Sequence, residues 1–275
     1  MRKLDIKEIQ QVSLEILKVV TDICEKENLR YYLTYGTLIG AIRHKGFIPW
    51  DDDIDVGMPR KDYDRFLEMT KGKIFDHFKV EENCDSSDVC YHLFTKVYDV
   101  NTTVIEKTRN QIKRGVWIDV FPLDGIGNTK DEVYKNYNKL SRLEKILYTR
   151  QCIPRKERVW YKNLAIRISQ LLPNFLVNDM ELARRINLLL RKYDFDNSKY
   201  VGNLVGSYFE KEIVEKSVFG VPKLYKFEDT EVYGVNDYDA YLKNVYGNYM
   251  KLPPIEKRLA NHDFILVDLN KSYLD

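Results

Sequence analysis

The segment that decides the fold is IPWDDDIDVGMP, residues 48–59, in which aspartate occupies four of five consecutive positions. Asp53 and Asp55 alternate with Ile54 and Val56, a pattern that predicts a half-buried strand with both carboxylates on one face, Cα atoms about 6.6 Å apart. Two charges at that distance repel by about 3 kcal/mol at an effective dielectric near 20. Mg²⁺ or Mn²⁺ would relieve this repulsion, so we expect a metal site. The alternative is a solvated acidic turn.

Two further segments flank this strand. YGTLIGAIR, residues 35–43, puts Gly36 and Thr37 at a strand-to-helix junction, where backbone amides can hold a phosphate. An ordinary tight turn is the alternative there. GVWIDVFPLD, residues 115–124, carries Asp119 as a lone carboxylate on an apolar strand, either as a third acid of the site or as a hydrogen-bonded strand-edge residue.

The rest of the chain predicts an α/β (α+β) fold, a mixed sheet flanked by helices with a helical insertion. Apolar residues at three- and four-residue steps from Ile6 to Ile23 indicate an N-terminal helix. Strand character is predicted at residues 31–35, 91–98, 102–106, 115–121 and 225–233, and Asn236 is expected to cap a last helix. Helical periodicity predicts helices at 131–150, 156–172 and 179–192. We therefore expect a catalytic core at 1–128, a helical insertion at 129–198, and a return to the core at 199–275.

Composition limits the function and the location. The 275 residues carry a net charge of +2, which gives no electrostatic case for nucleic acid. The four cysteines lack zinc-site spacing and are expected to be reduced thiols: Cys24, Cys84, Cys90 and Cys152. The charged N-terminus is not a signal peptide, and no apolar run is long enough to span a bilayer. We expect a cytoplasmic protein. Residues 150–172 are basic and amphipathic, which indicates either peripheral contact with the inner face of the membrane or a packed helix.

The acidic segment resembles a known family over a long stretch. YGTLIGAIRHKGFIPWDDDIDVGMPRKDYDRF, residues 35–66, is similar to the LicD family of phosphocholine transferases, of which fukutin and fukutin-related protein are distant relatives. WIDVFPLDGI at 117–126, YDAYLKNVYGNYMKLPP at 238–254 and EKR at 256–258 also resemble that family. The wider fold is similar to nucleotidyltransferases, although Thr37 stands where serine is usual and the gap before the aspartate pair is long.

The resemblance implies a reaction and a set of residues. Phosphocholine would move from CDP-choline to a hydroxyl of a cell-surface glycan, lipid-linked and of the teichoic acid or lipopolysaccharide type, with release of CMP. Asp53 and Asp55 would hold the metal, and Asp119 would complete the metal site or accept the hydroxyl proton. Phosphoryl-type transfer asks mainly for positioning and charge neutralisation, which such a site supplies.

Three alternatives stay open at the sequence level. The same fold could use another CDP-alcohol, such as CDP-ribitol. A metal-dependent glycosyltransferase also uses Asp-x-Asp to hold a nucleotide sugar. A non-catalytic choline- or glycan-binding module would have no use for clustered carboxylates.

Basic and aromatic residues near these motifs are candidates for substrate binding. The alternatives are a solvated loop for the charged residues and ordinary core packing for the rings. Expected at the diphosphate, or elsewhere on the substrate, are Gly36, Thr37, Arg43, His44, Lys45, Lys96, Arg258 and His262. Asp99 is a weaker candidate. A quaternary ammonium binds aromatic faces, for which the candidates are Trp50, Trp117, Tyr35 and Tyr246.

Overall fold

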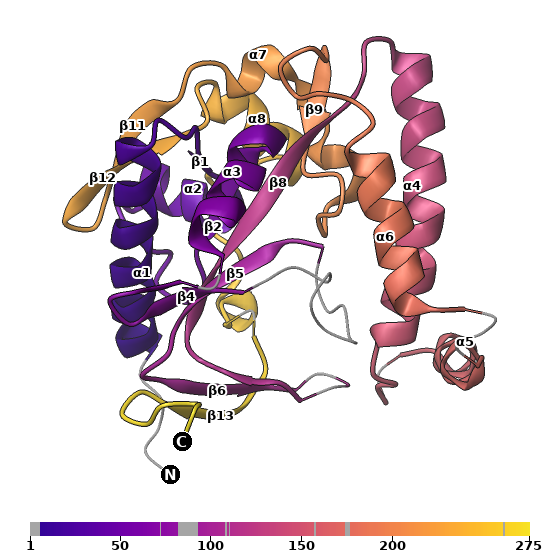
Figure 1. Cartoon of the computed structure of the whole chain (residues 1–275), viewed down its shortest axis with the longest axis horizontal. Coiled ribbons are helices and arrows are strands. Elements are labelled where there is room, and N and C mark those ends of the chain that lie inside the picture. The colour runs from indigo at the N-terminus through magenta and orange to yellow at the C-terminus, as the bar shows by residue number, and fades with distance from the viewer. Residues whose placement is uncertain are drawn as a thin grey trace.

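A computed structural model describes residues 6–71, 73–81, 93–107, 109, 111–156, 158–173, 177–260 and 262–275. A twisted mixed sheet runs through the centre, with helices on its faces and a group of helices to one side (Figure 1). The predicted α/β class with a mixed sheet is confirmed. The strand order is β11-β12-β1-β2-β8-β5-β4-β3, and β9 and β10 extend the sheet from β8.

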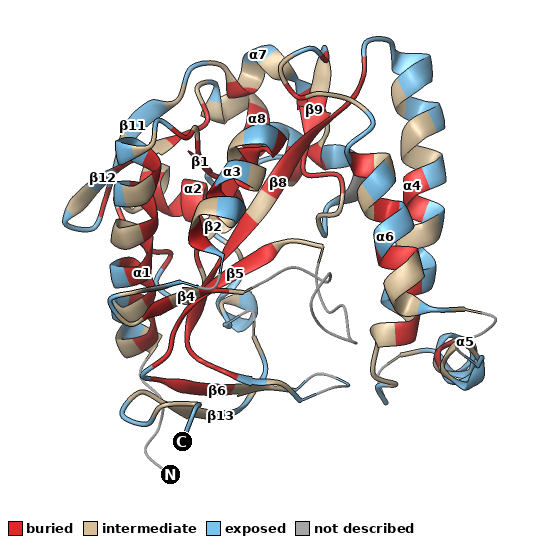
Figure 2. Ribbon diagram, in the orientation of Figure 1, coloured by how far each residue is buried: buried red, intermediate tan, exposed pale blue. Residues whose placement is uncertain are grey.

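The strands that carry the acidic motifs, β2 and β8, lie in the part of the sheet that runs from β1 to the β3 edge. Its strands are β1 (Tyr32–Leu33), β2 (Asp55–Pro59), β8 (Trp117–Gly127), β5 (Thr95–Asp99), β4 (Phe78–Val80) and β3 (Ile74–Phe75). β2 and β8 pair in parallel, whereas β5 is antiparallel to β8. β8 is buried along nearly its whole length, as expected for a central strand covered on both faces (Figure 2).

Helices cover this sheet and complete the main core. They are α1 (Ile6–Lys26), α2 (Tyr35–Arg43), α3 (Arg60–Thr70), α7 (Lys216–Phe219) and α8 (Tyr238–Tyr246). The predicted N-terminal helix is confirmed, but its buried face includes Leu17 and Val20, whereas Val19 of the predicted face is only partly buried. The hairpin of β11 (Lys223–Phe227) and β12 (Thr230–Gly234) adds the opposite edge of the sheet. The C-terminal part of the chain therefore shares one core with the N-terminal part.

The helical segment has a core of its own. It contains α4 (Lys130–Gln151), α5 (Trp160–Leu171) and α6 (Asp179–Leu190), close to the predicted ranges. A capping box of Thr129 and Glu132 starts α4. Leu140 and Leu147 of α4 belong to one buried cluster with Ile186 of α6. The insertion boundaries at 128 and 198 stay a prediction.

A small second sheet brings the C-terminus beside the catalytic core. It consists of β13 (Phe264–Asp268), β6 (Thr103–Glu106) and β7 (Lys113–Arg114), with β13 and β6 antiparallel. The remaining elements are β9 (Tyr200–Gly202), β10 (Val214–Glu215), η1 (Phe209–Glu212) and η2 (Ile255–Lys257). Because His262 lies just before β13, this pairing fixes its approach to the main sheet.

Several local predictions were wrong in detail. The strand expected at 31–35 covers only Tyr32–Leu33, because α2 already begins at Tyr35 with a positive φ of 46°. Asp53 precedes β2 rather than lying on it, since pairing begins at Asp55. The cap of α8 is Asp237, whose carboxylate accepts from the Ala240 N–H, not Asn236.

Other predictions differ at their ends or fall outside the described residues. β8 continues past residue 121 to Gly127, where it pairs with β9. In the predicted strand 91–98, β5 begins at Thr95, and residues 91–92 lie outside the described ranges. Cys24 and Cys152 are free thiols, whereas Cys84 and Cys90 are not among the described residues. No described helix is both long enough and apolar enough to cross a bilayer.

Candidate active site

Carboxylates gather around a cavity of about 390 Å³ at the centre of the sheet. Its acidic lining residues are Asp51, Asp53, Asp55, Glu106 and Asp119. The parallel register of β2 and β8 places Asp55 directly opposite Asp119, and Asp53 approaches from the loop before β2. Sequence reasoning predicted Asp53, Asp55 and Asp119 here but missed Asp51, whose place in the acidic run was the available signal.

Lys96 supplies a buried positive charge in this cavity. β5 pairs Lys96 with Asp119, and the lysine Nζ lies 2.7 Å from Asp119 Oδ1. The side chain is only 2% exposed, and its ammonium lies 4.2 Å from the ring centre of Trp117. A buried lysine needs such partners, because an unpaired buried ammonium is strongly destabilising. The Trp117 ring therefore stabilises the Lys96 ammonium, although Trp117 itself does not line the cavity.

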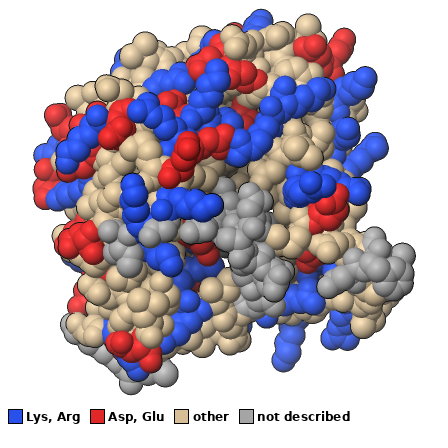
Figure 3. Space-filling view, in the orientation of Figure 1, with Lys and Arg blue, Asp and Glu red and all other residues tan. Residues whose placement is uncertain are grey.

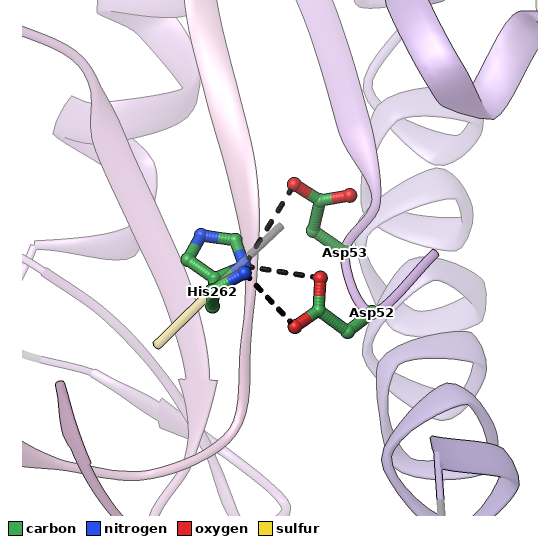
Figure 4. Close-up of side chains that lie close together, drawn as sticks. All are labelled: Asp52, Asp53 and His262. Atoms are coloured by element: carbon green, nitrogen blue, oxygen red, sulfur yellow. Dashed lines mark hydrogen bonds and ion pairs between the residues drawn. The ribbon is translucent and has the colours of Figure 1, made fainter. Parts of the chain in front are cut away.

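His262 contacts the aspartates from the C-terminal segment (Figure 4). Its Nδ1 lies 3.2 Å from Asp52 Oδ1 and 4.0 Å from Asp53 Oδ2, and its backbone N–H donates to Asp52 Oδ2 at 3.3 Å. Burial by itself lowers the pKa of His262, but the hydrogen bond with Asp52 and the charge of Asp53 outweigh it and raise that pKa to about 9. In this arrangement His262 is a cation at neutral pH, and it partly balances the acidic cavity.

Desolvation dominates the electrostatics of the aspartates. Burial, followed by repulsion from Asp53, raises the pKa of Asp51 to about 8. Asp53 and Asp55 keep part of their surface open to the cavity, yet both lie deep in the protein. Burial is the largest cause that raises the pKa of each, and the charge of Asp119 adds to it. The site therefore lacks positive charge for the number of carboxylates that it holds.

The donor atoms suit a hard divalent cation. Within the described part of the chain, one group of three side chains has ligand atoms all within 4.8 Å: Asp52, Asp53 and His262. That group differs from the predicted set, and His262 would have to release its proton to ligate a cation. Asp53, Asp55 and Asp119 line one cavity with oxygen ligands, but Asp119 is occupied by Lys96. The residues fit Mg²⁺ or Mn²⁺ by donor chemistry, and their role as ligands stays a prediction.

The start of α2 positions the aspartates. A Cβ on Gly36 would lie 2.6 Å from Asp51 Oδ2, so only glycine allows the acid to come this close to the helix start. The Thr37 hydroxyl accepts from the Asp55 N–H at 2.8 Å. Thr37 is buried outside the cavity lining and holds the first residue of β2 in place.

Aromatic rings form the remaining walls of the cavity: Tyr35, Phe94, Phe121, Tyr208 and Tyr246. Tyr35 stacks on Tyr208 with ring centres 5.9 Å apart, and Tyr208 meets Tyr246 edge-on at 4.8 Å. The Tyr35 hydroxyl donates to Glu212. Strand alternation was a signal for Phe121, two residues after Asp119, and for Phe94, two residues before Lys96, whereas Tyr208 reaches the site only through tertiary packing.

Several predicted substrate-binding residues lie outside this cavity lining: Arg43, His44, Lys45, Trp50 and Arg258. Arg43 donates to the Tyr249 carbonyl at 2.7 Å, and the Arg258 guanidinium lies 5.2 Å from the ring centre of Trp50. Burial, and then the charge of Arg258, lowers the pKa of Arg43. Asp99 is also remote from the cavity and lies 3.8 Å from His77 Nε2. A substrate-binding role for these residues stays a prediction.

Comparison with known proteins identifies the family. Residues 28–159, which include Asp53, Asp55 and Asp119, match the LicD/FKTN/FKRP nucleotidyltransferase domain. The chain is 33% identical over 264 residues to the lipopolysaccharide cholinephosphotransferase LicD of Haemophilus influenzae, covering 95% of this chain and 97% of that protein. It is also 42% identical over 48 residues to the human ribitol 5-phosphate transferase FKRP, covering 18% of this chain and 10% of FKRP. Since the first similarity runs along nearly the whole of both proteins, this chain belongs to the LicD family.

Proposed function

We propose that this chain transfers phosphocholine from CDP-choline to a hydroxyl of a cell-surface glycan and releases CMP. The observation that carries the proposal is one cavity whose lining combines carboxylates with aromatic rings that contact one another. A full-length relative named as a cholinephosphotransferase supports the same assignment. The carboxylates suit a metal-bound diphosphate, and the aromatic rings suit a quaternary ammonium.

Asp53 and Asp55 would bind Mg²⁺ or Mn²⁺ in this cavity. When bound, the ion would neutralise the diphosphate of the donor. In the transfer, the acceptor oxygen forms a bond to the phosphorus that carries choline, and the bond from that phosphorus to the CMP oxygen breaks. The hydroxyl proton must leave, and Asp119 lies in the same cavity as an acceptor for it. Asp119 as a third metal ligand remains the alternative role.

Lys96 links the two possible roles of Asp119. Its 2.7 Å ion pair holds the Asp119 carboxylate on the β5 side of the cavity. While that pair persists, the Asp119 carboxylate is held in one orientation in the cavity. Lys96 is itself a lining residue, so its ammonium also provides positive charge for phosphate oxygens of the donor.

The aromatic rings that line the cavity would bind the choline group. Tyr208 and Tyr246 meet edge-on, and Phe121 lies 5.7 Å from Tyr35, so several ring faces border one space. Cation–π contacts contribute about 0.5–2 kcal/mol each, more where water is excluded. Nearby carboxylates add attraction for a permanent cation that cannot donate a hydrogen bond.

CDP-ribitol is the second candidate donor, favoured by the similarity to FKRP over 48 residues. A polyol would use hydrogen bonds to polar lining groups such as Asn203 and Ser207 rather than ring faces. A nucleotide sugar, as in a metal-dependent glycosyltransferase, is the remaining alternative.

We also propose peripheral contact with an anionic membrane through α5, where a lipid-linked acceptor would be found. Ile166 is the buried residue of this helix, and four apolar side chains that could have packed are instead exposed: Trp160, Leu164, Ile168 and Leu171. Figure 2 shows α5 largely in the exposed colour. Exposed basic residues, among them Lys156 and Lys162, lie beside these apolar groups.

Thermal unfolding with candidate donors tests the proposal. CDP-choline with Mg²⁺ should stabilise the protein by about 2.7 kcal/mol at one hundred times its Kd, and chelation should abolish most of that gain. Tyr246→Leu should reduce the gain from CDP-choline but not from CMP, whereas Tyr134→Leu, at an exposed ring of α4, should change neither. Stronger stabilisation by CDP-ribitol or UDP-glucose would replace the choline assignment.

A further inference from the structure

A second cavity adjoins the acidic one. It has a volume of about 470 Å³, and Phe94, Val205 and Ser207 line both cavities, so the two are neighbours across one shared wall. The C-terminal end of α4 and the loop that follows it form the far side. The helical segment therefore borders a cavity that adjoins the catalytic centre.

The second cavity has the opposite charge to the first. Among the described residues, its charged lining groups are the cations Lys107, Arg109, Arg155 and Arg158 and the acid Glu144. Arg109 donates to the Arg150 carbonyl at 2.6 Å and Arg158 to the Ile153 carbonyl at 3.2 Å. Each guanidinium has five N–H donors, so these single bonds leave most of them for a ligand.

Two other wall features suit a sugar. Apolar and aromatic groups, among them Phe94, Leu147 and Tyr148, border the same space and can cover the face of a ring. Burial raises the pKa of Glu144 to about 7. When this carboxyl is protonated it does not repel an anion, and it can donate a hydrogen bond to a sugar oxygen. The volume lies within the range of small-molecule sites.

We infer that this basic cavity is the acceptor subsite and that the acceptor is an anionic, phosphate-bearing saccharide. The inference rests on the proposed transfer, because the reacting hydroxyl would reach the donor past Phe94, Val205 and Ser207, which line both cavities. Guanidinium groups favour phosphate through charge-assisted, bidentate hydrogen bonds. Separate acidic and basic cavities would keep donor and acceptor in their own places before transfer.

A lipid surface fits this cavity less well than a saccharide does. The cationic groups line a cavity beside the catalytic centre, whereas the exposed apolar side chains suited to a bilayer lie along α5. Figure 3 shows basic and acidic side chains interspersed over the described part of the visible face, so positive charge alone does not single out a membrane surface there.

Binding of glucose 6-phosphate and of glucose, measured by calorimetry without donor, tests the inference. The full-length protein should bind glucose 6-phosphate at least about tenfold more tightly than glucose, as expected for charge-assisted contacts. Arg155→Gln should remove most of that preference, because the Arg155 side chain is exposed and lines the cavity. Arg142→Gln, at an exposed position of α4 outside the cavity lining, is the matched control and should keep it.

The outcomes separate the subsite from the proposed function. Equal affinity for glucose and glucose 6-phosphate, or equal effects of the two variants, would overturn the acceptor subsite even if CDP-choline binds with Mg²⁺. Binding of glucose 6-phosphate through Arg155 without any binding of CDP-choline would instead reject the donor and leave an anion site. Vesicles of phosphatidylglycerol that need Arg155, with no binding of glucose 6-phosphate, would assign the cavity to lipid and overturn the inference.

Discussion

Asp119 lies between two partners in the sheet, Asp55 opposite it on β2 and Lys96 opposite it on β5. The parallel pairing places a carboxylate beside Asp119, and the antiparallel pairing places an ammonium 2.7 Å from it. Neighbouring strands are about 4.8 Å apart, so the two acids are close enough to share a cation. The sheet register alone thus fixes three charged groups of the site.

Replacing the predicted metal ligands should separate activity from stability. Asp53→Asn and Asp55→Asn keep the side-chain shape but remove a charge, so Mg²⁺-dependent CMP release should fall by at least about 10²-fold. Without metal, neither variant should melt below the wild type, because each removes one carboxylate from a buried cavity that lacks positive charge. Melting curves in chelator and CMP release with Mg²⁺ measure both.

Asp22→Asn, at an exposed position of α1, is the matched control and should change neither quantity. Asp119→Asn should resemble the other two variants if Asp119 is a metal ligand. If it is only the base, nucleotide binding with Mg²⁺ should persist while turnover is lost. An Asp53 or Asp55 variant that melts early yet keeps near-normal specific activity would reject the active-site assignment.

Lys96→Met tests the buried ion pair. Removing one partner of a buried pair typically costs about 3–5 kcal/mol, and here it leaves the Asp119 carboxylate without its ammonium. In chelator the variant should therefore melt well below the wild type. Mg²⁺ should restore part of the loss, because Asp119 becomes free to interact with the ion. A deficit that Mg²⁺ leaves unchanged would show that Asp119 does not take part in metal binding.

Glu212 predicts a pH dependence of stability. It is fully buried, accepts from the Tyr208 N–H at 2.7 Å, and its pKa is raised by burial from 4.5 to about 7. Its stabilising contribution is complete below pH 4.5 and is lost as pH rises toward 7, because the unfolded state loses its proton first. The loss amounts to at most about 3 kcal/mol, and Glu212→Gln should remove it. Urea unfolding from pH 4.5 to 8 measures the difference, and identical slopes for both proteins would contradict it.

The sequence predicted the elements of the site better than their geometry. Alternation predicted one strand that carries Asp55 and another that carries Asp119, and in the structure these two strands pair and border one cavity. Local pattern could not show that Asp53 precedes β2, which depends on where β2 begins to pair with β8, or that Asp52 turns toward His262, which lies just before the small C-terminal sheet. The family resemblance carried the rest of the functional reading.

Residues that meet only through tertiary structure were the hardest to predict. Arg43 and Lys45 are near the acidic run in sequence, yet neither lines the cavity, whereas Tyr208 does so from far along the chain. Sequence proximity is a poor guide once a chain turns, because a helix start redirects it within a few residues. The helices of the insertion were accurate, since their periodicity is local.

Membrane contact through α5 can be separated into apolar and electrostatic parts. Lys156→Glu with Lys162→Glu should weaken binding to vesicles of phosphatidylglycerol by about 1 kcal/mol or more per residue, and added salt should mimic the change. Leu164→Ser with Ile168→Ser should weaken binding at all salt concentrations, because these exposed side chains would lose apolar burial. Lys226→Glu with Lys223→Glu, at exposed positions of β11, is the matched control. Sedimentation with vesicles measures all three pairs, and binding that tolerates both changes in α5 would show that this helix does not meet the membrane.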